Sequence, residues 1–142
     1  MIRTIQIMQE EQFFSKILNQ QETKMPLVKI NMLKGKSQDY KKTVFDCVHQ
    51  SLITAFQIQD WDRFQRIEEF DKCNFEIPEG KTDNFMIIEF TVFPGRTTEQ
   101  KKCLIETVTG ALVEKLSIAQ TDIFITIIEP PLENWGMGGN QK

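Results

Sequence analysis

The sequence KGKSQDYKKTVFDCVHQSLITAFQIQDWDRFQRIEE (residues 34–69) returns without a gap as PGRTTEQKKCLIETVTGALVEKLSIAQTDIFITIIE (residues 94–129). Identical residues then stand 60 positions apart, among them Gly35 and Gly95, Val48 and Val108, Leu52 and Leu112, Asp62 and Asp122, Phe64 and Phe124, Glu69 and Glu129. Self-similarity of this kind predicts two copies of one supersecondary unit.

Each copy has the pattern of a strand followed by a helix. Short apolar runs rich in β-formers, LVKINML (27–33) and IIEFTVF (87–93), each end before a glycine-containing turn. Ser37 and Thr97 then stand where a helix N-cap is expected, and Thr97 with Gln100 fits a capping box. The sequence therefore predicts a helix start directly after each turn.

The helices carry apolar residues at helical spacing and lead into a second strand. The repeated positions are Tyr40, Val44, Val48 and Leu52 in the first half, and Leu104, Val108, Leu112 and Leu116 in the second. RFQRIEEF (63–70) and DIFITII (122–128) follow as the predicted return strands. Each half is thus a strand–helix–strand unit.

Two such units predict an α/β two-layer sandwich over residues 26–132. Strands joined by a helical crossover lie parallel in one sheet with a right-handed connection. A four-stranded mixed sheet with two helices on one face follows, with an irregular insert at about 71–84. If a pseudo-two-fold axis relates the halves, their first strands run antiparallel and Pro26 lies close to Arg96. A side-by-side parallel arrangement would separate these two residues.

Composition excludes several classes of function. The chain has 142 residues, which suits one domain, and its net charge of −3 with pI near 5.3 offers no basic surface for nucleic acid or an anionic membrane. No run approaches the ~20 apolar residues of a membrane span. Three cysteines without CxxC spacing and a single histidine are a poor metal set and suggest a reducing cytoplasm. We expect no metal, cofactor, nucleic acid or membrane partner.

Several short motifs carry a resemblance to a known family. They are MPLVKI (25–30), DCVHQSL (46–52), DRFQRI (62–67), GRTTEQK (95–101) and ENWGM (133–137). On these motifs the chain resembles the tautomerase superfamily, and within it most the malonate semialdehyde decarboxylase branch. The resemblance extends from Pro26 to about Met137.

The resemblance implies an enzyme and the residues of its site. Pro26 holds the place of the family's catalytic N-terminal amine, Asp62 that of its acidic partner, and Arg96 that of one of two carboxylate-binding arginines. Pro94 stands where the second arginine would be. The apolar wall falls on two residues, Trp135 and Met137. The resemblance further implies acid/base chemistry on a small keto or unsaturated carboxylic acid, decarboxylase-like with keto–enol tautomerase activity beside it, in a homotrimer without a cofactor.

The chemistry depends on the state of the proline nitrogen. A terminal α-amine has a pKa near 7.7–8.0, against about 10.4 for a lysine amine, and a nearby cation or a desolvated pocket lowers it further. Such an amine can act as acid or base near neutral pH. An internal proline nitrogen is an amide and cannot. Arg96, before a helix N-terminus, suits an anionic group, although a solvated surface arginine fits the spacing equally. For Asp62 the residues alone favour a structural turn, as its repeat mate Asp122 indicates.

Residues 1–25 have no repeat partner and precede the predicted domain, 26–142. Three interpretations are open. The segment forms a real helical extension, with Phe13, Phe14, Ile17 and Leu18 as an apolar stripe, and the protein is a non-catalytic binding or assembly module. Alternatively it is a propeptide that is cleaved, or translation starts at Met25. In the last two cases the chain begins at Pro26.

Overall fold

The computed structural model describes residues 2–22 and 25–142. The main elements in chain order are α1 (Ile2–Glu22), β1 (Leu27–Leu33), α2 (Gln38–Phe56), β2 (Phe64–Phe70), β3 (Met86–Thr91), α3 (Thr98–Leu116) and β4 (Ile123–Ile128). Three short 3₁₀ turns lie at Lys72–Asn74, Gln120–Asp122 and Leu132–Asn134, and a small hairpin, β5 (Gly136–Met137) and β6 (Asn140–Gln141), follows the last of them.

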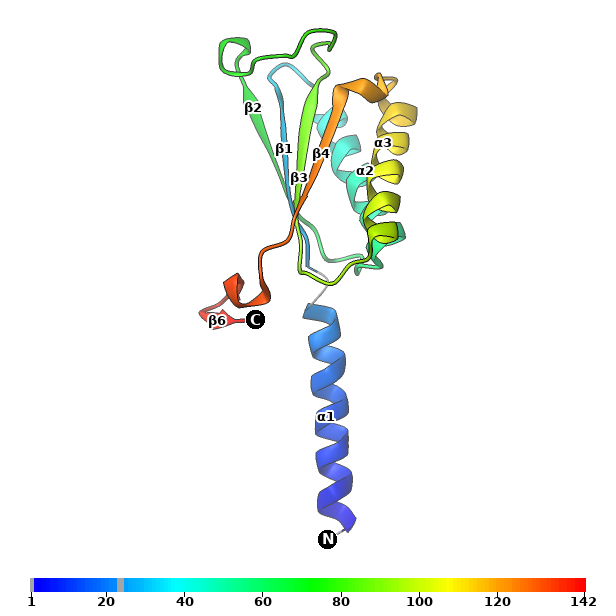
Figure 1. The fold of residues 1–142 in the computed structure, drawn as a ribbon, viewed down its shortest axis with the longest axis vertical. Coiled ribbons are helices and arrows are strands. Elements are labelled where there is room, and N and C mark those ends of the chain that lie inside the picture. Colours follow the sequence, from blue (N-terminus) through cyan, green and yellow to red (C-terminus); the bar gives the residue numbers. More distant parts are fainter. Residues whose placement is uncertain (1, 23–24) are drawn as a thin grey trace.

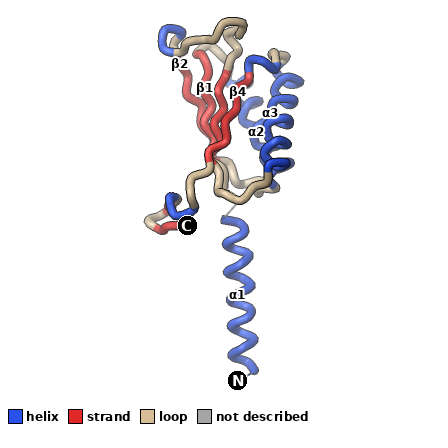
Figure 2. Tube along the Cα trace, viewed as in Figure 1, coloured by secondary structure: helices blue, strands red, loops and turns tan. Residues whose placement is uncertain are grey.

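The sheet has the predicted mixed topology. Its order is β2-β1-β3-β4, with β1 parallel to β2 and β3 parallel to β4. The two first strands, β1 and β3, pair antiparallel at the centre, with Leu27 opposite Thr91. Helices α2 and α3 cover one face of this sheet (Figures 1 and 2). The predicted fold class is therefore confirmed, and the halves are related by a pseudo-two-fold axis as the antiparallel alternative required.

The helix ends repeat between the halves as closely as the sequence does. The Ser37 side chain accepts a hydrogen bond from the Tyr40 N–H, and Thr97 forms a full capping box with Gln100. Both helices end at a residue in the left-handed conformation, and neither residue is glycine: Gln57 (φ 57°) caps α2 and Ser117 (φ 54°) caps α3. The N-caps satisfy orphan backbone donors and the left-handed residues satisfy orphan carbonyls, so both helix lengths are set locally.

Two glycines make the turns that lead from the first strands into the helices. Gly35 and Gly95 both adopt φ +115°. A residue with a side chain is strained in this backbone conformation, whereas glycine adopts it freely. The matched glycines of the repeat therefore reflect one turn geometry, used twice.

The core lies between the sheet and the two helices. It is built from the inward residues of β1 and β3 and the apolar faces of α2 and α3: Val28, Ile30, Met32, Val44, Val48, Leu52, Met86, Ile88, Phe90, Leu104, Val108 and Leu112. These side chains come almost equally from the two halves, so neither half closes its core alone. The opposite face of the sheet has no helix over it (Figure 1).

The structure differs from the predictions at the ends of elements. The strand predicted over 87–93 spans Met86–Thr91, and each return strand begins one residue later than predicted. The C-terminal hairpin was not predicted at all. Its turn uses Gly138 (φ 60°) and Gly139 (φ 83°), a pair of positive-φ residues that suits a tight hairpin.

The N-terminal segment forms the long helix α1, which extends away from the two-layer domain (Figure 1). The described side chains of this helix, residues 2–12, are exposed. The predicted apolar stripe of Phe13, Phe14, Ile17 and Leu18 lies outside the described side chains. Among residues 2–22 and 25–142, no helix combines the length and apolar character that a membrane crossing requires.

Candidate active site

Pro26 lies at the edge of the domain where the two central strands begin and end. It is buried and directly precedes β1, so the pairing of Leu27 with Thr91 places it beside the end of β3. From there the chain runs through Phe93 and the Gly95 turn to Arg96. The tertiary structure thus brings Pro26 to the end of the sheet from which Arg96 extends. In the chain as described, the Pro26 nitrogen is an amide joined to Met25.

Asp62 is a buried carboxylate without a hydrogen-bond partner. Its residue is only 1% exposed, and neither Oδ1 nor Oδ2 has a partner among the described residues. Burial raises the pKa of Asp62 to about 6, while the positive charge of Arg96 acts in the opposite direction. A buried polar group that forms no hydrogen bond costs about 1–3 kcal/mol, more when it is charged. This unfavourable arrangement marks Asp62 as a candidate functional residue.

Arg96 is held in place without a direct ion pair. Its Nη1 donates to the Phe93 carbonyl at 3.1 Å, and its guanidinium carbon lies 4.9 Å from the centre of the Phe56 ring. Burial lowers the pKa of Arg96, and the carboxylates of Glu129 and Asp62 raise it. Most of its five N–H donors have no protein acceptor within the described residues. They are available to a carboxylate.

The repeat supplies a direct comparison for Asp62. Its mate Asp122 is equally buried, but both of its oxygens are satisfied. Oδ1 accepts from the Thr82 N–H at 2.8 Å, and Oδ2 accepts from the Thr82 hydroxyl at 2.5 Å. Thr82 belongs to the chain that leads into β3. The structural role considered for Asp62 therefore fits Asp122, whereas the Asp62 carboxylate has no such partner.

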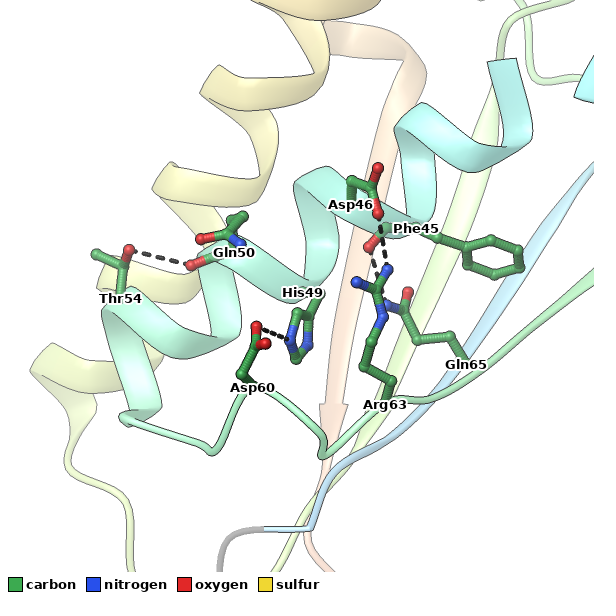
Figure 3. Close-up of polar contacts among 8 residues, drawn as sticks. All are labelled: Phe45, Asp46, His49, Gln50, Thr54, Asp60, Arg63 and Gln65. Atoms are coloured by element: carbon green, nitrogen blue, oxygen red, sulfur yellow. Dashed lines mark hydrogen bonds and ion pairs between the residues drawn. The ribbon is translucent and has the colours of Figure 1, made fainter. Parts of the chain in front are cut away.

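The loop that carries Asp62 is anchored to α2 on both sides of this residue. His49 Nε2 lies 3.6 Å from Asp60 Oδ1, and Arg63 Nη2 donates to Asp46 Oδ1 at 2.8 Å (Figure 3). His49 itself is fully buried. Residues 60 and 63 are thus tied down while the carboxylate between them stays unbonded.

Trp135 and Met137 lie on the wall of a small apolar cavity. The Trp135 ring meets the Phe93 ring at 4.6 Å between centres, tilted by 59°. The cavity measures about 90 Å³ and is lined by Met25, Leu27, Phe93, Trp135, Gly136, Met137 and Lys142. Ligand sites usually measure ~300–1,000 Å³. Met25 is 9% exposed and occupies part of this space, so the cavity would be larger without it.

Contacts connect the five predicted residues into one region of the domain. Asp62 and Arg96 interact electrostatically, Arg96 is bonded to Phe93, and Phe93 packs on Trp135. The residues on either side of Pro26 line the same cavity as Met137. A larger groove of about 610 Å³, between α2 and β2, includes none of the five. No group of three or more metal-binding side chains occurs within the described part of the chain.

Sequence analysis missed Phe93, Phe56 and Met25 as site residues. A signal for the two aromatics was present in the repeat. Phe56 aligns with Leu116 and Phe93 with Leu33, while residues around them match closely. Where one copy of the repeat has an aromatic residue and the other has leucine, the aromatic residue is a candidate for a role at its own end of the domain.

Comparison with known proteins identifies the family. Models of tautomerase enzymes match residues 26–84 and residues 62–138. The chain is 30% identical over 122 residues to the probable tautomerase YusQ of Bacillus subtilis (strain 168), with 82% of this chain and 96% of that protein covered. The chain belongs to the tautomerase family.

Solved structures agree with this and with the branch inferred from the motifs. The structure of FG41 malonate semialdehyde decarboxylase inhibited by 3-bromopropiolate is similar at a TM-score of 0.71 and 26% identity, over 79% of this chain and 88% of that one. An asymmetric trimer of wild-type fused 4-OT has the same fold at a TM-score of 0.73 and 19% identity, over 81% and 94% of the two chains.

Proposed function

We propose that this chain acts as a tautomerase-family enzyme when Pro26 is its first residue. The Pro26 amine exchanges a proton with a small keto or unsaturated carboxylic acid, Asp62 orients water or substrate, and Arg96 binds the carboxylate. The reaction is decarboxylation or hydration, with slower keto–enol tautomerisation beside it. If the Pro26-started chain were inactive toward both malonate semialdehyde and phenylpyruvate, this proposal would be refuted.

The observation that supports the proposal most is the contrast between Asp62 and Asp122. In the second half, the chain before β3 supplies Thr82 to the buried carboxylate. In the repeat, Pro26 at the entry to β1 aligns with Met86 at the entry to β3, which lies at the other end of the sheet. When Pro26 is the first residue, its charged amine enters at the end where the carboxylate has no partner. A positive charge there offsets the cost of burying Asp62.

Arg96 accounts for the class of substrate. A guanidinium with open donors binds a carboxylate through paired, charge-assisted hydrogen bonds. Because Pro94 replaces the second arginine of the family's pattern, one such anchor remains beside the apolar wall of Phe93, Trp135 and Met137. This supports a substrate with one carboxylate and a small apolar or carbonyl-bearing remainder.

We predict that Arg96→Ala raises KM about 10- to 150-fold with a smaller change in kcat. Hydrogen bonds to a charged group contribute ~1.5–3 kcal/mol, which corresponds to this range. Arg96→Lys keeps the charge but loses the paired hydrogen-bond geometry, so its KM should lie between those of the wild type and the alanine variant. Steady-state kinetics of the Pro26-started chain measures both, and an unchanged KM in the alanine variant would exclude the proposed role.

The full chain supports a second candidate function. Met25 is buried against the cavity and α1 forms a continuous helix before it. A chain that retains residues 1–25 has an amide at Pro26 and is then a non-catalytic binding or assembly protein. The intact mass of the protein from its native source separates the two forms. A mass that starts at Pro26 supports catalysis, and one that starts at Met1 supports the second function.

We further propose that the protein forms a homotrimer in the cytoplasm. All three cysteines are free thiols, which suits a reducing compartment. The helix-free face of the sheet presents apolar residues, including Leu27, Ile87, Phe124 and Ile128, and Phe124 is 57% exposed. Exposed apolar side chains on a sheet face without a helix favour association, and the similar fused 4-OT is described as a trimer.

The prediction for this face is a trimer in sedimentation equilibrium at micromolar concentration. Phe124→Glu should convert it to a monomer, because an unpaired charge buried at the interface is strongly unfavourable. Glu106→Gln, on the exposed side of α3, is the matched control and should leave the trimer intact. A monomeric unmodified chain would contradict the assignment of this face.

A further inference from the structure

The aromatic ring beneath Arg96 distinguishes the two ends of the repeat. At the Pro26 end, the guanidinium lies over Phe56, the last residue of α2. At the other end, the matching residues are Lys36 and Leu116. Lys36 is directed elsewhere, with its Nζ 5.0 Å from the Tyr40 ring and bonded to Asn84. The pairing of a cation with the final helix residue thus occurs at the candidate site and is absent from its counterpart within residues 25–142.

We infer that Phe56 positions Arg96 to receive the substrate carboxylate. This rests on the proposed function and adds a residue to it. The ring covers one face of the guanidinium at 4.9 Å, and the Phe93 carbonyl takes one donor at 3.1 Å. The remaining donors lie in the guanidinium plane and have no protein acceptor among the described residues. A preorganised guanidinium loses less rotational freedom on binding.

Phe56 is itself rigid, which makes it suitable for this role. It is 3% exposed, packs in the core cluster and precedes the left-handed cap Gln57. Leu116 serves at the matching end of α3, so an aliphatic side chain can also finish such a helix. Packing alone therefore does not require an aromatic ring here. The ring is required only if it acts on Arg96.

The test replaces Phe56 by leucine, the residue of the second half, and measures carboxylate binding. The probes are phenylacetate, an unreactive carboxylate, and its neutral methyl ester, titrated by calorimetry into the full chain and the Pro26-started chain. We expect Phe56→Leu to weaken phenylacetate binding roughly tenfold, the scale of a partly desolvated cation–π contact, and to leave the ester unchanged. In the Pro26-started chain KM should rise with little change in kcat.

Two further variants separate positioning from packing. Phe90→Leu makes the same side-chain change at a fully buried core residue whose ring has no cation–π contact with Arg96 among the described residues, so it should leave phenylacetate affinity unchanged even if the melting temperature falls. Trifluorinated phenylalanine at position 56 keeps the ring's shape while weakening its negative face, so it should lower affinity even if the leucine variant fails to fold.

The outcomes decide the inference independently of the reaction. Equal phenylacetate affinity in the wild-type, leucine and fluorinated chains would overturn it, as would absence of phenylacetate binding in the wild-type protein. Loss of affinity equal in Phe90→Leu and Phe56→Leu would overturn it too. Weakened binding in the Phe56 variants together with no enzymatic activity in any form would support the positioning role and refute the proposed reaction.

Discussion

A chain that begins at Pro26 should be about 10²- to 10⁴-fold more active than the same domain with one extra residue before the proline, the usual contribution of general acid–base catalysis. The reason is covalent. In the longer chain the proline nitrogen is an amide and does not titrate near neutral pH. In the shorter chain it is a secondary amine beside Arg96 and Asp62, whose charges shift its pKa in opposite directions.

The sharpest control differs from the active form by one residue. A chain that starts Met-Ala-Pro26 loses its initiator and keeps alanine on the proline, which acylates the nitrogen and leaves the rest of the domain intact. Equal activity of the two forms toward malonate semialdehyde would show that Pro26 is not the catalytic amine. The full chain, with Met25 in the cavity, should be as inactive as the acylated control.

The pH dependence of the same assay assigns the role of the amine. We expect decarboxylation or hydration to fall as the pH rises through the pKa of Pro26, because the protonated amine is the acid. Tautomerisation of phenylpyruvate should instead rise through it, because the neutral amine is the base. Assays from pH 5 to 9 measure both. A decarboxylation rate that increases with pH would contradict the acid role.

The second large effect is a stability gain from removing the charge of Asp62 in the full chain. The pKa of Asp62 is about 6 in the folded state, above its ordinary value of 3.8, so the folded protein binds this proton more tightly than the unfolded one. Its contribution to stability is therefore greatest below pH ~4, declines as the pH rises toward ~6 and is constant above it. The difference corresponds to roughly 3 kcal/mol.

The asparagine of the Asp62→Asn variant does not titrate, so the stability of this variant relative to the wild type should increase as the pH rises. Denaturant unfolding at pH 4 and pH 7 should show the free-energy difference between variant and wild type growing by about 2–3 kcal/mol. The buried amide of asparagine affects stability equally at both pH values, so it does not contribute to this change. In the Pro26-started form the gain should shrink, because the prolinium charge near Asp62 favours its ionised form. In the Pro26-started chain, Asp62→Asn should also lower the enzymatic activity about 10²-fold.

The repeat provides the control for this experiment as well. Asp122→Asn disturbs a carboxylate that accepts two hydrogen bonds from Thr82, so it should destabilise the fold at pH 7 by about 1–3 kcal/mol. Opposite signs for the two asparagine variants are expected. A destabilised Asp62→Asn at pH 7, with no change in the difference from pH 4, would show that Asp62 is structural.

The fold could be predicted from local features of the sequence. The repeat, the N-caps Ser37 and Thr97, the turn glycines and the helical spacing of apolar residues are local features, and each acts within a few residues of where it is written. Two matching units with helices on one face then required the four-stranded sheet, and the antiparallel centre follows from a pseudo-two-fold axis. The family motifs supplied Pro26, Asp62 and Arg96 as candidates.

Tertiary contacts show which of the two equivalent aspartates lacks a hydrogen-bond partner among the described residues. Asp62 and Asp122 occupy the same place in the repeat, so the repeat by itself does not separate them. Thr82 reaches Asp122 across 40 positions of sequence, and Arg96 meets Phe56 from the other half of the chain. Hydrogen-bond satisfaction and ring contacts depend on which distant segments pack together. For that reason the fold could be predicted from periodicity, while the unpaired carboxylate of Asp62 and the contact of Phe56 with Arg96 required the assembled molecule.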